Sequence, residues 1–265
     1  MRSPVIAYTL EQAAPDAPLA VITLDNPSKL NALDEQALRD LDAAYARAEA
    51  DGARAVLLRG EGRAFCAGRD ISGVDPQDDD VLGYLDGLVT PLLRRMADFP
   101  APTFAAAQGA CLGVGLGLLI ATDVVYVAED ARIGSPFAAL GATLDSGGHA
   151  LFFERLGAHK TLDLIYTGRL MSGDEAVRSG LFSRTFPAAE LAERTREAAV
   201  LAASGATAAF AESKRIVARL RDERLGVWGA LSLENRAQAG LRDTDDYREG
   251  FAAFRAKRQP VFRGR

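Results

Sequence analysis

A glycine-rich junction between an apolar strand and an apolar helix constrains the fold of this chain more than any other feature. Residues 102–107 are small and apolar and predict a buried strand, and the segment 108–123 runs on from it. Its glycines are Gly109, Gly113, Gly115 and Gly117. Glycine lets a backbone approach a ligand closely, and the first turn of a helix leaves N–H groups unpaired at the positive end of its dipole. The junction therefore either holds an anion, or an oxygen that becomes one, or only permits tight packing of helix against sheet.

Strands and helices alternate through the first half of the chain. The predicted strands are 5–10, 19–24, 55–60, 102–107, 124–128 and 131–134. The first two are separated by a turn with Pro and Asp and predict an antiparallel hairpin. Asp34 opens a long amphipathic helix, a second helix is expected over 81–98, and the acidic run 74–80 is interpreted as a mobile surface loop. This alternation favours an α/β fold with crossover connections.

Beyond about residue 149 the pattern becomes helical. The expected helices are 148–156, 158–166, 173–179, 187–203, 206–221, 225–238 and 244–256. We therefore expect an α/β core over residues 1–200 that carries the site, and a C-terminal helical region over 201–265. The second region has too few strand signals for another α/β unit, so we expect it to pack on the core or on another subunit.

The composition is that of an ordinary soluble protein and disfavours several classes of function. Of the 265 residues, 48% are hydrophobic and 25% charged, and the net charge is −5 without a basic stripe, so no nucleic acid partner is expected. The two cysteines and two histidines lack the spacing of a disulfide framework or a metal site, so no metal is expected. Residues 1–4 lack the start of a signal peptide, and the run 110–121 is too short to span a bilayer. We expect a cytoplasmic protein without a membrane partner.

A second loop shares the chemistry of the glycine-rich junction. Residues 65–71 follow the strand 55–60 and hold small residues around Gly68, which exposes backbone amides. Two convergent N–H donors are what an oxyanion hole requires, and one such donor lowers a reaction barrier by roughly 3–4 kcal/mol. The two loops together therefore predict a site that stabilises the oxygen of a thioester as it becomes an enolate or a tetrahedral adduct.

Five motifs in a fixed order resemble those of one family. They are 26–33 (NPSKLNAL), 65–71 (FCAGRDI), 109–123 with its closing Asp, 167–181 with T-G-R followed by A…G-L, and 247–262 with K-R-Q-P-V-F at its end. Over nearly its whole length the chain resembles the crotonase superfamily, the enoyl-CoA hydratase/isomerase family. Within that family it is most similar to the enoyl-CoA isomerases of the phenylacetate-pathway type.

The resemblance implies a fold, an assembly and a mode of binding. The implied fold is a spiral of ββα units with a C-terminal helical trimerisation region, and members are commonly homotrimers or dimers of trimers. Members bind acyl-CoA thioesters and hold the thioester oxygen with two backbone N–H groups, which fall here on Arg69 and Val114. No metal or redox cofactor is implied, because coenzyme A arrives as part of the substrate. The residues assigned to substrate or CoA binding are Lys29, Ala67, Asp70, Ile71, Phe137, Phe254 and Lys257.

Some of these assignments have a simpler alternative. Lys29 and Lys257 are also interpretable as solvated surface lysines. The terminal helix, which carries the last two residues of that set, reaches in the family toward the CoA of a neighbouring subunit. We expect Asp70 to order its own loop as well. Cys66 and Cys111 flank the two loops and are interpreted as packing residues rather than nucleophiles, because no His–Asp pairing accompanies them.

The acid/base positions decide the reaction, and here the sequence departs from the hydratases. Hydratases carry two glutamates that activate water, and their positions fall on Gly117 and Phe137, which transfer no proton. General acid–base catalysis contributes typically ~10²–10⁴-fold, so an efficient hydratase is disfavoured. Asp145 lies in the segment 141–148 (GATLDSGG), which resembles the G-x-x-P-D-S-G-G of the isomerases with leucine in place of proline. The resemblance makes Asp145 catalytic, whereas the residues alone also allow it to cap the following helix.

The favoured prediction is an enoyl-CoA double-bond isomerase in which Asp145 moves a proton between two carbons of the acyl chain. Another enzymatic interpretation is a divergent enoyl-CoA hydratase, or a hydrolase or dehalogenase-like enzyme with Asp145 as its nucleophile. A non-enzymatic interpretation is an acyl-CoA binding protein that kept the oxyanion pocket and lost turnover. His149 lies one helical turn beyond Asp145 and either lines the pocket or is a packed or surface histidine.

Overall fold

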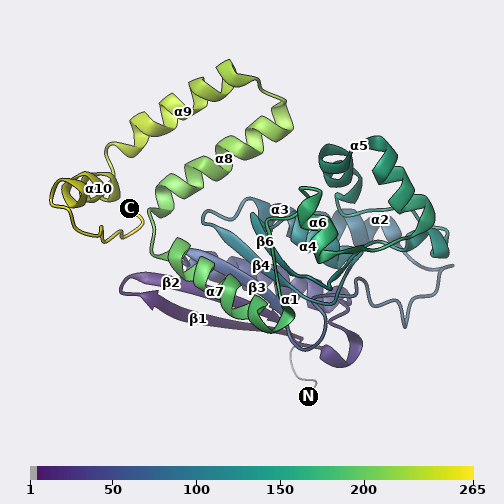
Figure 1. The fold of residues 1–265 in the computed structure, drawn as a ribbon. Helices are drawn as coiled ribbons and strands as arrows, with labels where there is room; N and C mark the ends of the chain where they lie inside the picture. The colour runs from purple at the N-terminus through teal and green to yellow at the C-terminus, as the bar shows by residue number, and fades with distance from the viewer. Residues whose placement is uncertain (1–4) are drawn as a thin grey trace.

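A six-stranded sheet lies at the centre of the computed structural model, in the order β1-β2-β3-β4-β6-β9 (Figure 1). The model describes residues 5–265, so the expectation drawn from residues 1–4 lies outside the described residues. The strands are β1 Ile6–Ala14, β2 Ala17–Leu24, β3 Ala55–Gly60, β4 Thr103–Ala107, β6 Val124–Ala128 and β9 Arg184–Phe186. β1 and β2 form the predicted antiparallel hairpin, and the other neighbouring pairs are parallel. The predicted α/β class is confirmed.

A smaller sheet joins β5, β7 and β8 in that order and lies beside the glycine-rich junction. Its strands are β5 Ala110–Leu112, β7 Arg132–Gly134 and β8 Met171–Ser172, and β5 leads directly into helix α4 Val114–Ile120. Of these strands the sequence predicted only β7. β5, β8 and β9 were missed because they are 3, 2 and 3 residues long, too short to show the alternation of a strand.

Both faces of the large sheet are buried, because successive residues of its strands point in opposite directions. On one face Ile22 and Leu58 join the main core, which also contains the apolar stripe of α1 Glu35–Ala50. On the other face Leu19 and Leu57 pack beneath α7 Ala188–Ala203. Each of these leucines is at most 3% exposed, and burying a side chain of this size contributes about 1.5–3 kcal/mol to folding.

The helices follow the predicted pattern with two local departures. Beside α1, α4 and α7 they are α2 Val81–Tyr84, α3 Thr90–Ala97, α5 Gly148–Thr167, α6 Gly173–Arg178, α8 Thr207–Glu223, α9 Val227–Leu241 and α10 Asp245–Arg255, with short 3-10 turns at η1 Pro27–Lys29 and η3 Phe137–Leu140. The helix expected over 81–98 is interrupted by a π-helical turn, η2 Leu85–Val89. The two helices expected over 148–166 are the halves of α5, which breaks at Gly157, where φ is 75°.

Helices α8 to α10 and the residues after them, 207–265, extend away from the sheet as a C-terminal arm (Figure 1). The arm exposes large apolar side chains, among them Trp228 at 81% and Phe254 at 84%. Its last residues return to the core, where the Arg54 guanidinium donates to the Phe262 carbonyl at 3.0 Å. The division of the chain at residue 200 and the trimer stay predictions. Among residues 5–265 no helix combines the length and apolarity that crossing a membrane requires.

Candidate active site

Backbone pairing places the two glycine-containing loops side by side. Cys66 and Cys111 form an isolated parallel β-bridge. The Cys66 amide donates to the Ala110 carbonyl at 2.9 Å, and the Leu112 amide donates to the Cys66 carbonyl at 3.0 Å. The first loop is thereby hydrogen-bonded at Cys66 to β5, which leads into the second loop. The convergence of the two loops, which the sequence predicts, is confirmed.

The two predicted oxyanion donors each follow a glycine with a left-handed backbone. Gly68 precedes Arg69 with φ 102°, and Gly113 precedes Val114 with φ 52°, where a residue with a side chain would be strained. A Cβ placed on Gly113 would lie 3.9 Å from the Cα of Gly68, so the two glycines approach closely. Among the described residues the amides of Arg69 and Val114 have no backbone partner, although those of Asp70 and Gly113 do. Both N–H groups are therefore free to bind an acceptor.

Asn31 fixes the first loop from the opposite side. Its side chain is fully buried and donates to the carbonyls of Glu61 and Ala64 at 3.0 and 2.8 Å, while its oxygen accepts from the Asn26 amide at 2.8 Å. An asparagine side chain satisfies all three groups because it carries both donors and an acceptor. The N-A-L motif, which the sequence analysis used only as a family marker, therefore has a structural role in holding the oxyanion loop.

Asp145 lies in the turn between η3 and α5 and is half buried. Its carboxylate accepts a hydrogen bond from the Ser146 hydroxyl at 2.8 Å. Burial raises the pKa of Asp145 above its ordinary value, and the Ser146 hydrogen bond and the charges of Arg69 and His149 oppose that rise. The alternative that Asp145 caps the following helix is wrong, because Gly147 is the residue before α5 and no side chain caps that helix.

Both of the positions where hydratases carry glutamate lie in close packing contacts. A Cβ placed on Gly117 would lie 2.5 Å from the Cβ of Ser146, a separation that real Cβ atoms essentially never show. Phe137, at the second position, begins η3 and turns its ring toward the other loop, since its Cζ lies 3.0 Å from a Cβ placed on Gly113. The turn that carries Asp145 therefore occupies the space into which a residue 117 side chain would extend.

The side chain of Arg69 connects the oxyanion loop with α2, a role that the sequence analysis did not assign. Its terminal nitrogens donate to both carboxylate oxygens of Asp79 at 2.7 and 2.8 Å, and its guanidinium carbon lies 3.9 Å from the centre of the Tyr84 ring. The hydrogen bonds from Arg69 lower the pKa of Asp79. Residues 74–80 are predicted to be a mobile surface loop, and within this run the Asp79 side chain is 15% exposed and anchored by this ion pair. The mobility of the loop stays a prediction.

Lys29 and Asp70 form an ion pair at the edge of the site. The Lys29 ammonium lies 2.6 Å from the Asp70 carboxylate, which also accepts from the Ser72 amide and hydroxyl at 3.1 and 2.6 Å. Hydrogen bonds from Lys29 and Ser72 lower the pKa of Asp70 to about 2. Asp70 therefore orders its own loop, as predicted. Ala67 is partly exposed and Ile71 is 54% exposed, and the assignment of all four residues to CoA binding stays a prediction.

Phe254 and Lys257 do not join this site within one chain. Phe254 lies on α10 and Lys257 follows it, at the end of the arm farthest from α4 and α5 (Figure 1).

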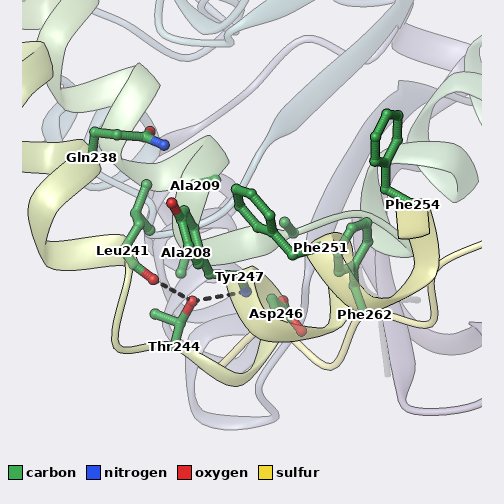
Figure 2. A pocket seen from close by; sticks show the side chains of 12 residues that line it. Ala208, Ala209, Gln238, Leu241, Thr244, Asp246, Tyr247, Phe251, Phe254 and Phe262 are labelled. Atoms are coloured by element: carbon green, nitrogen blue, oxygen red, sulfur yellow. Dashed lines mark hydrogen bonds between the residues drawn. The ribbon is translucent and has the colours of Figure 1, made fainter. Parts of the chain in front are cut away.

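An apolar cavity of about 380 Å³ lies at this end of the arm, between α8, α9 and α10, and Phe254 is among its lining residues (Figure 2). Thr244 closes the turn before α10, accepting from the Tyr247 amide at 3.1 Å and donating to the Leu241 carbonyl at 2.8 Å (Figure 2). The prediction that these residues meet the CoA of a neighbouring subunit is compatible with this position and stays a prediction.

The remaining titratable candidates play no visible part in the site. Burial raises the pKa of Cys66 to about 12 and also raises that of Cys111, which fits the packing role expected for both thiols. His149 is exposed on the first turn of α5. Within residues 5–265 no group of three or more His, Cys, Asp or Glu side chains has the geometry to hold a metal ion.

Comparison with known proteins decides the family. The model of the enoyl-CoA hydratase/isomerase family matches residues 15–265. The chain belongs to the enoyl-CoA hydratase/isomerase family. The predicted crotonase-superfamily membership is thereby confirmed, and the chain is an acyl-CoA enzyme of that family.

Relatives within the enoyl-CoA hydratase/isomerase family carry two kinds of name. A protein of Rhodobacter capsulatus named a probable enoyl-CoA hydratase is 35% identical over 247 residues, which are 93% of this chain and 95% of that protein. The 1,2-epoxyphenylacetyl-CoA isomerase of Escherichia coli is 30% identical over 249 residues, 92% of this chain and 94% of that protein. The crystal structure of an enoyl-CoA hydratase from Bacillus anthracis superposes with a TM-score of 0.86 at 28% identity and covers 97% of this chain and 99% of its own. The predicted crotonase fold is confirmed.

Proposed function

We propose that this family member is an enoyl-CoA isomerase that moves a double bond along the acyl chain of a thioester. Asp145 removes a proton from C2 of a 3-enoyl-CoA, and the electron pair delocalises onto the thioester oxygen, held by the N–H groups of Arg69 and Val114. The protonated Asp145 then returns the proton to C4, which gives the conjugated 2-enoyl-CoA. The reaction is balanced because the proton that leaves C2 is returned to C4 and no atom is gained or lost.

One observation carries the proposal: a half-buried carboxyl, Asp145, lies in the turn that packs against α4. Its neighbour Ser146 packs against Gly117, which lies one turn after Val114 in α4. Burial raises the pKa of Asp145, which makes the carboxylate a better base than an exposed aspartate. A single carboxyl that both accepts and returns a proton is sufficient for isomerisation. Hydration by two glutamates needs a second carboxyl, and positions 117 and 137 supply none.

The test replaces the carboxyl and retains its shape. Asp145→Asn is expected to lower the rate of conversion of a 3-enoyl-CoA to the 2-enoyl-CoA by ~10²–10⁴-fold, measured by the absorbance of the conjugated thioester. Asp78→Asn, in the exposed part of the acidic run, is the matched control and is expected to leave the rate unchanged. An Asp145→Asn protein that isomerises as fast as the parent would falsify the proposal.

Enoyl-CoA hydration is the second candidate, because the relatives include several proteins named as enoyl-CoA hydratases. In this chain a hydration would rely on Asp145 alone to activate water. The two candidates are separated by supplying the parent protein with a 2-enoyl-CoA, which an isomerase leaves largely conjugated and a hydratase converts to a 3-hydroxyacyl-CoA. Rapid loss of the conjugated absorbance with no activity on the 3-enoyl-CoA would establish the hydratase instead.

A further inference from the structure

Tyr84 carries a buried hydroxyl group that the protein leaves without a hydrogen-bond partner. The residue is 4% exposed, and among the described residues no group bonds to its hydroxyl oxygen. A buried polar atom of this kind is destabilising unless a partner is supplied, so its retention requires an explanation. Tyr84 ends α2, which Asp80 caps by accepting from the Gly83 amide at 2.9 Å. A π-helical turn follows directly, and such turns occur frequently at functional sites.

The Tyr84 ring lies against the oxyanion loop. The guanidinium carbon of Arg69 stands 3.9 Å from the ring centre, over its face. Arg69 cannot move freely, because Asp79 holds both of its terminal nitrogens. The backbone N–H of the same residue is the proposed donor to the thioester oxygen. Tyr84 is therefore fixed about one arginine side chain away from the backbone N–H to which the thioester oxygen would bind.

The hydroxyl of Tyr84 acts only as a neutral group. Burial raises its pKa, the charge of Asp145 raises it further, and only Arg69 opposes them, so the phenol keeps its proton at neutral pH. The protonated hydroxyl can therefore donate a hydrogen bond to an acceptor. Among the described residues no acceptor lies within hydrogen-bond distance of the Tyr84 hydroxyl, which points to an acceptor that arrives with the ligand.

We propose that the Tyr84 hydroxyl donates a hydrogen bond to an oxygen on the acyl chain of the substrate, so that this site selects acyl-CoA thioesters whose acyl group bears oxygen. The inference rests on the proposed function, because it takes the thioester to be bound at Arg69 and Val114. A site built to hydrogen-bond a substrate oxygen discriminates against the analogue that lacks it, since the buried donor is then left unpaired.

The chain provides a matched control in Tyr45. Its hydroxyl is also buried and unpartnered, but Tyr45 lies on α1 and its ring packs against Phe99 in the core, 6.0 Å from the Phe99 ring centre. Tyr84→Phe and Tyr45→Phe each remove one unpaired buried hydroxyl and leave the ring. Both variants are expected to fold with a melting temperature equal to or above that of the parent, so a change confined to Tyr84→Phe reports on the ligand.

The experiment measures binding of saturated thioesters, which no isomerase converts. Hexanoyl-CoA is compared with hexanoyl-CoA thioesters hydroxylated at C3, C4, C5 or C6, by calorimetry, on the parent and both variants. At least one hydroxylated thioester is expected to bind the parent about tenfold more tightly than hexanoyl-CoA. Tyr84→Phe is expected to reduce that preference to less than about threefold by weakening only the hydroxylated ligand, and Tyr45→Phe is expected to retain it.

Two results would overturn the inference: no hydroxylated thioester preferred by the parent, or a preference that survives in Tyr84→Phe. In both cases the isomerase assay with Asp145→Asn still stands, so the proposed function is judged separately. Failure of the parent to bind any of these thioesters would overturn the inference and count against the proposed function as well.

Discussion

Gly117 and Ser146 are in close contact, because a Cβ placed on Gly117 would lie only 2.5 Å from the Cβ of Ser146. The contact joins helix α4, whose first amide is a proposed oxyanion donor, to the turn that carries Asp145. A side chain at position 117 would push this turn outward and take Asp145 with it. Gly117 therefore has two consequences. It supplies no glutamate at this hydratase position, and it leaves the space occupied by the turn that carries Asp145.

The first prediction is that Gly117→Glu does not create a hydratase. The new side chain collides with Ser146, and overpacking of this kind typically lowers the free energy of unfolding by about 1–3 kcal/mol. Isomerisation of a 3-enoyl-CoA should fall, because Asp145 is displaced, and no hydration of a 2-enoyl-CoA should appear. Thermal unfolding and both assays check this.

The double variant Gly117→Glu with Ser146→Gly serves as the control, because it removes the colliding Cβ. It should regain most of the lost stability. A single Gly117→Glu protein as stable as the parent, or one that hydrates a 2-enoyl-CoA, would contradict the role assigned to this contact.

The sequence predicted five of the six strands of the main sheet and the convergence of the two glycine loops, because those features have strong local signals. The strand segments 55–58 and 124–128 are continuous apolar runs, and each oxyanion loop contains a glycine where the backbone must take a positive φ. Even the break in α5 was visible, since the predicted helices stop and restart around Gly157. Motifs quoted in order then identified the family, which the comparison confirmed.

What the sequence did not predict depends on contacts between distant residues. Nothing in the acidic run distinguishes Asp79 from its neighbours, because only the folded chain brings it to Arg69. Tyr84 likewise has no motif, and its missing partner becomes apparent only when the surroundings of the hydroxyl are known. Asp145 illustrates the intermediate case, since a cap and a catalytic base share one sequence pattern, and the geometry of the helix start excludes the cap.

The second prediction concerns the pH dependence of activity. Asp145 must be deprotonated to accept a proton, so activity should fall as the pH drops through its raised pKa. The charge of Arg69 lowers that pKa, so Arg69→Met should raise it and move the acid limb of the kcat/KM profile to higher pH. The backbone N–H is retained, so the oxyanion contact survives the substitution.

Arg95→Met is the control for this experiment. It also removes one positive charge, but from an ion pair with Asp42 on the outer face of α1 and α3. Its pH profile should match that of the parent. An acid limb in Arg69→Met that stays in place, or shifts to lower pH, would show that Arg69 does not act on Asp145.

The third prediction links the same carboxyl to stability. The folded pKa of Asp145 lies above the unfolded value, so the folded chain binds the proton more tightly and stability falls as pH rises through that interval. At pH values above the folded pKa, the buried negative charge of Asp145 opposes folding. Asp145→Asn should therefore melt at a higher temperature than the parent at pH 7. The difference should disappear below the ordinary pKa of 3.8. Calorimetry at both pH values tests this, and an Asp145→Asn protein less stable than the parent at pH 7 would oppose it.

The last prediction concerns Arg54, which ties three distant segments together. Arg54 is only 6% exposed. Its guanidinium donates to the Asp16 carbonyl at 2.7 Å, to the Phe262 carbonyl at 3.0 Å and to the Thr207 hydroxyl at 3.0 Å. It also donates to the Gly205 carbonyl. The hairpin turn, the start of α8 and the end of the C-terminal arm therefore share one cation.

Arg54→Met keeps the apolar stem but leaves these acceptors unpaired. Because hydrogen bonds to charged groups contribute about 1.5–3 kcal/mol each, the free energy of unfolding should fall by at least ~3 kcal/mol. Amide hydrogen exchange should quicken first in residues 256–265, whose attachment to the core is lost. Arg178→Met is the control, since Arg178 is 74% exposed and its ion pair with Asp174 spans 3.7 Å, so its loss should change stability by no more than about 0.5 kcal/mol. Equal destabilisation by the two substitutions would mean that Arg54 does not fasten the arm to the core.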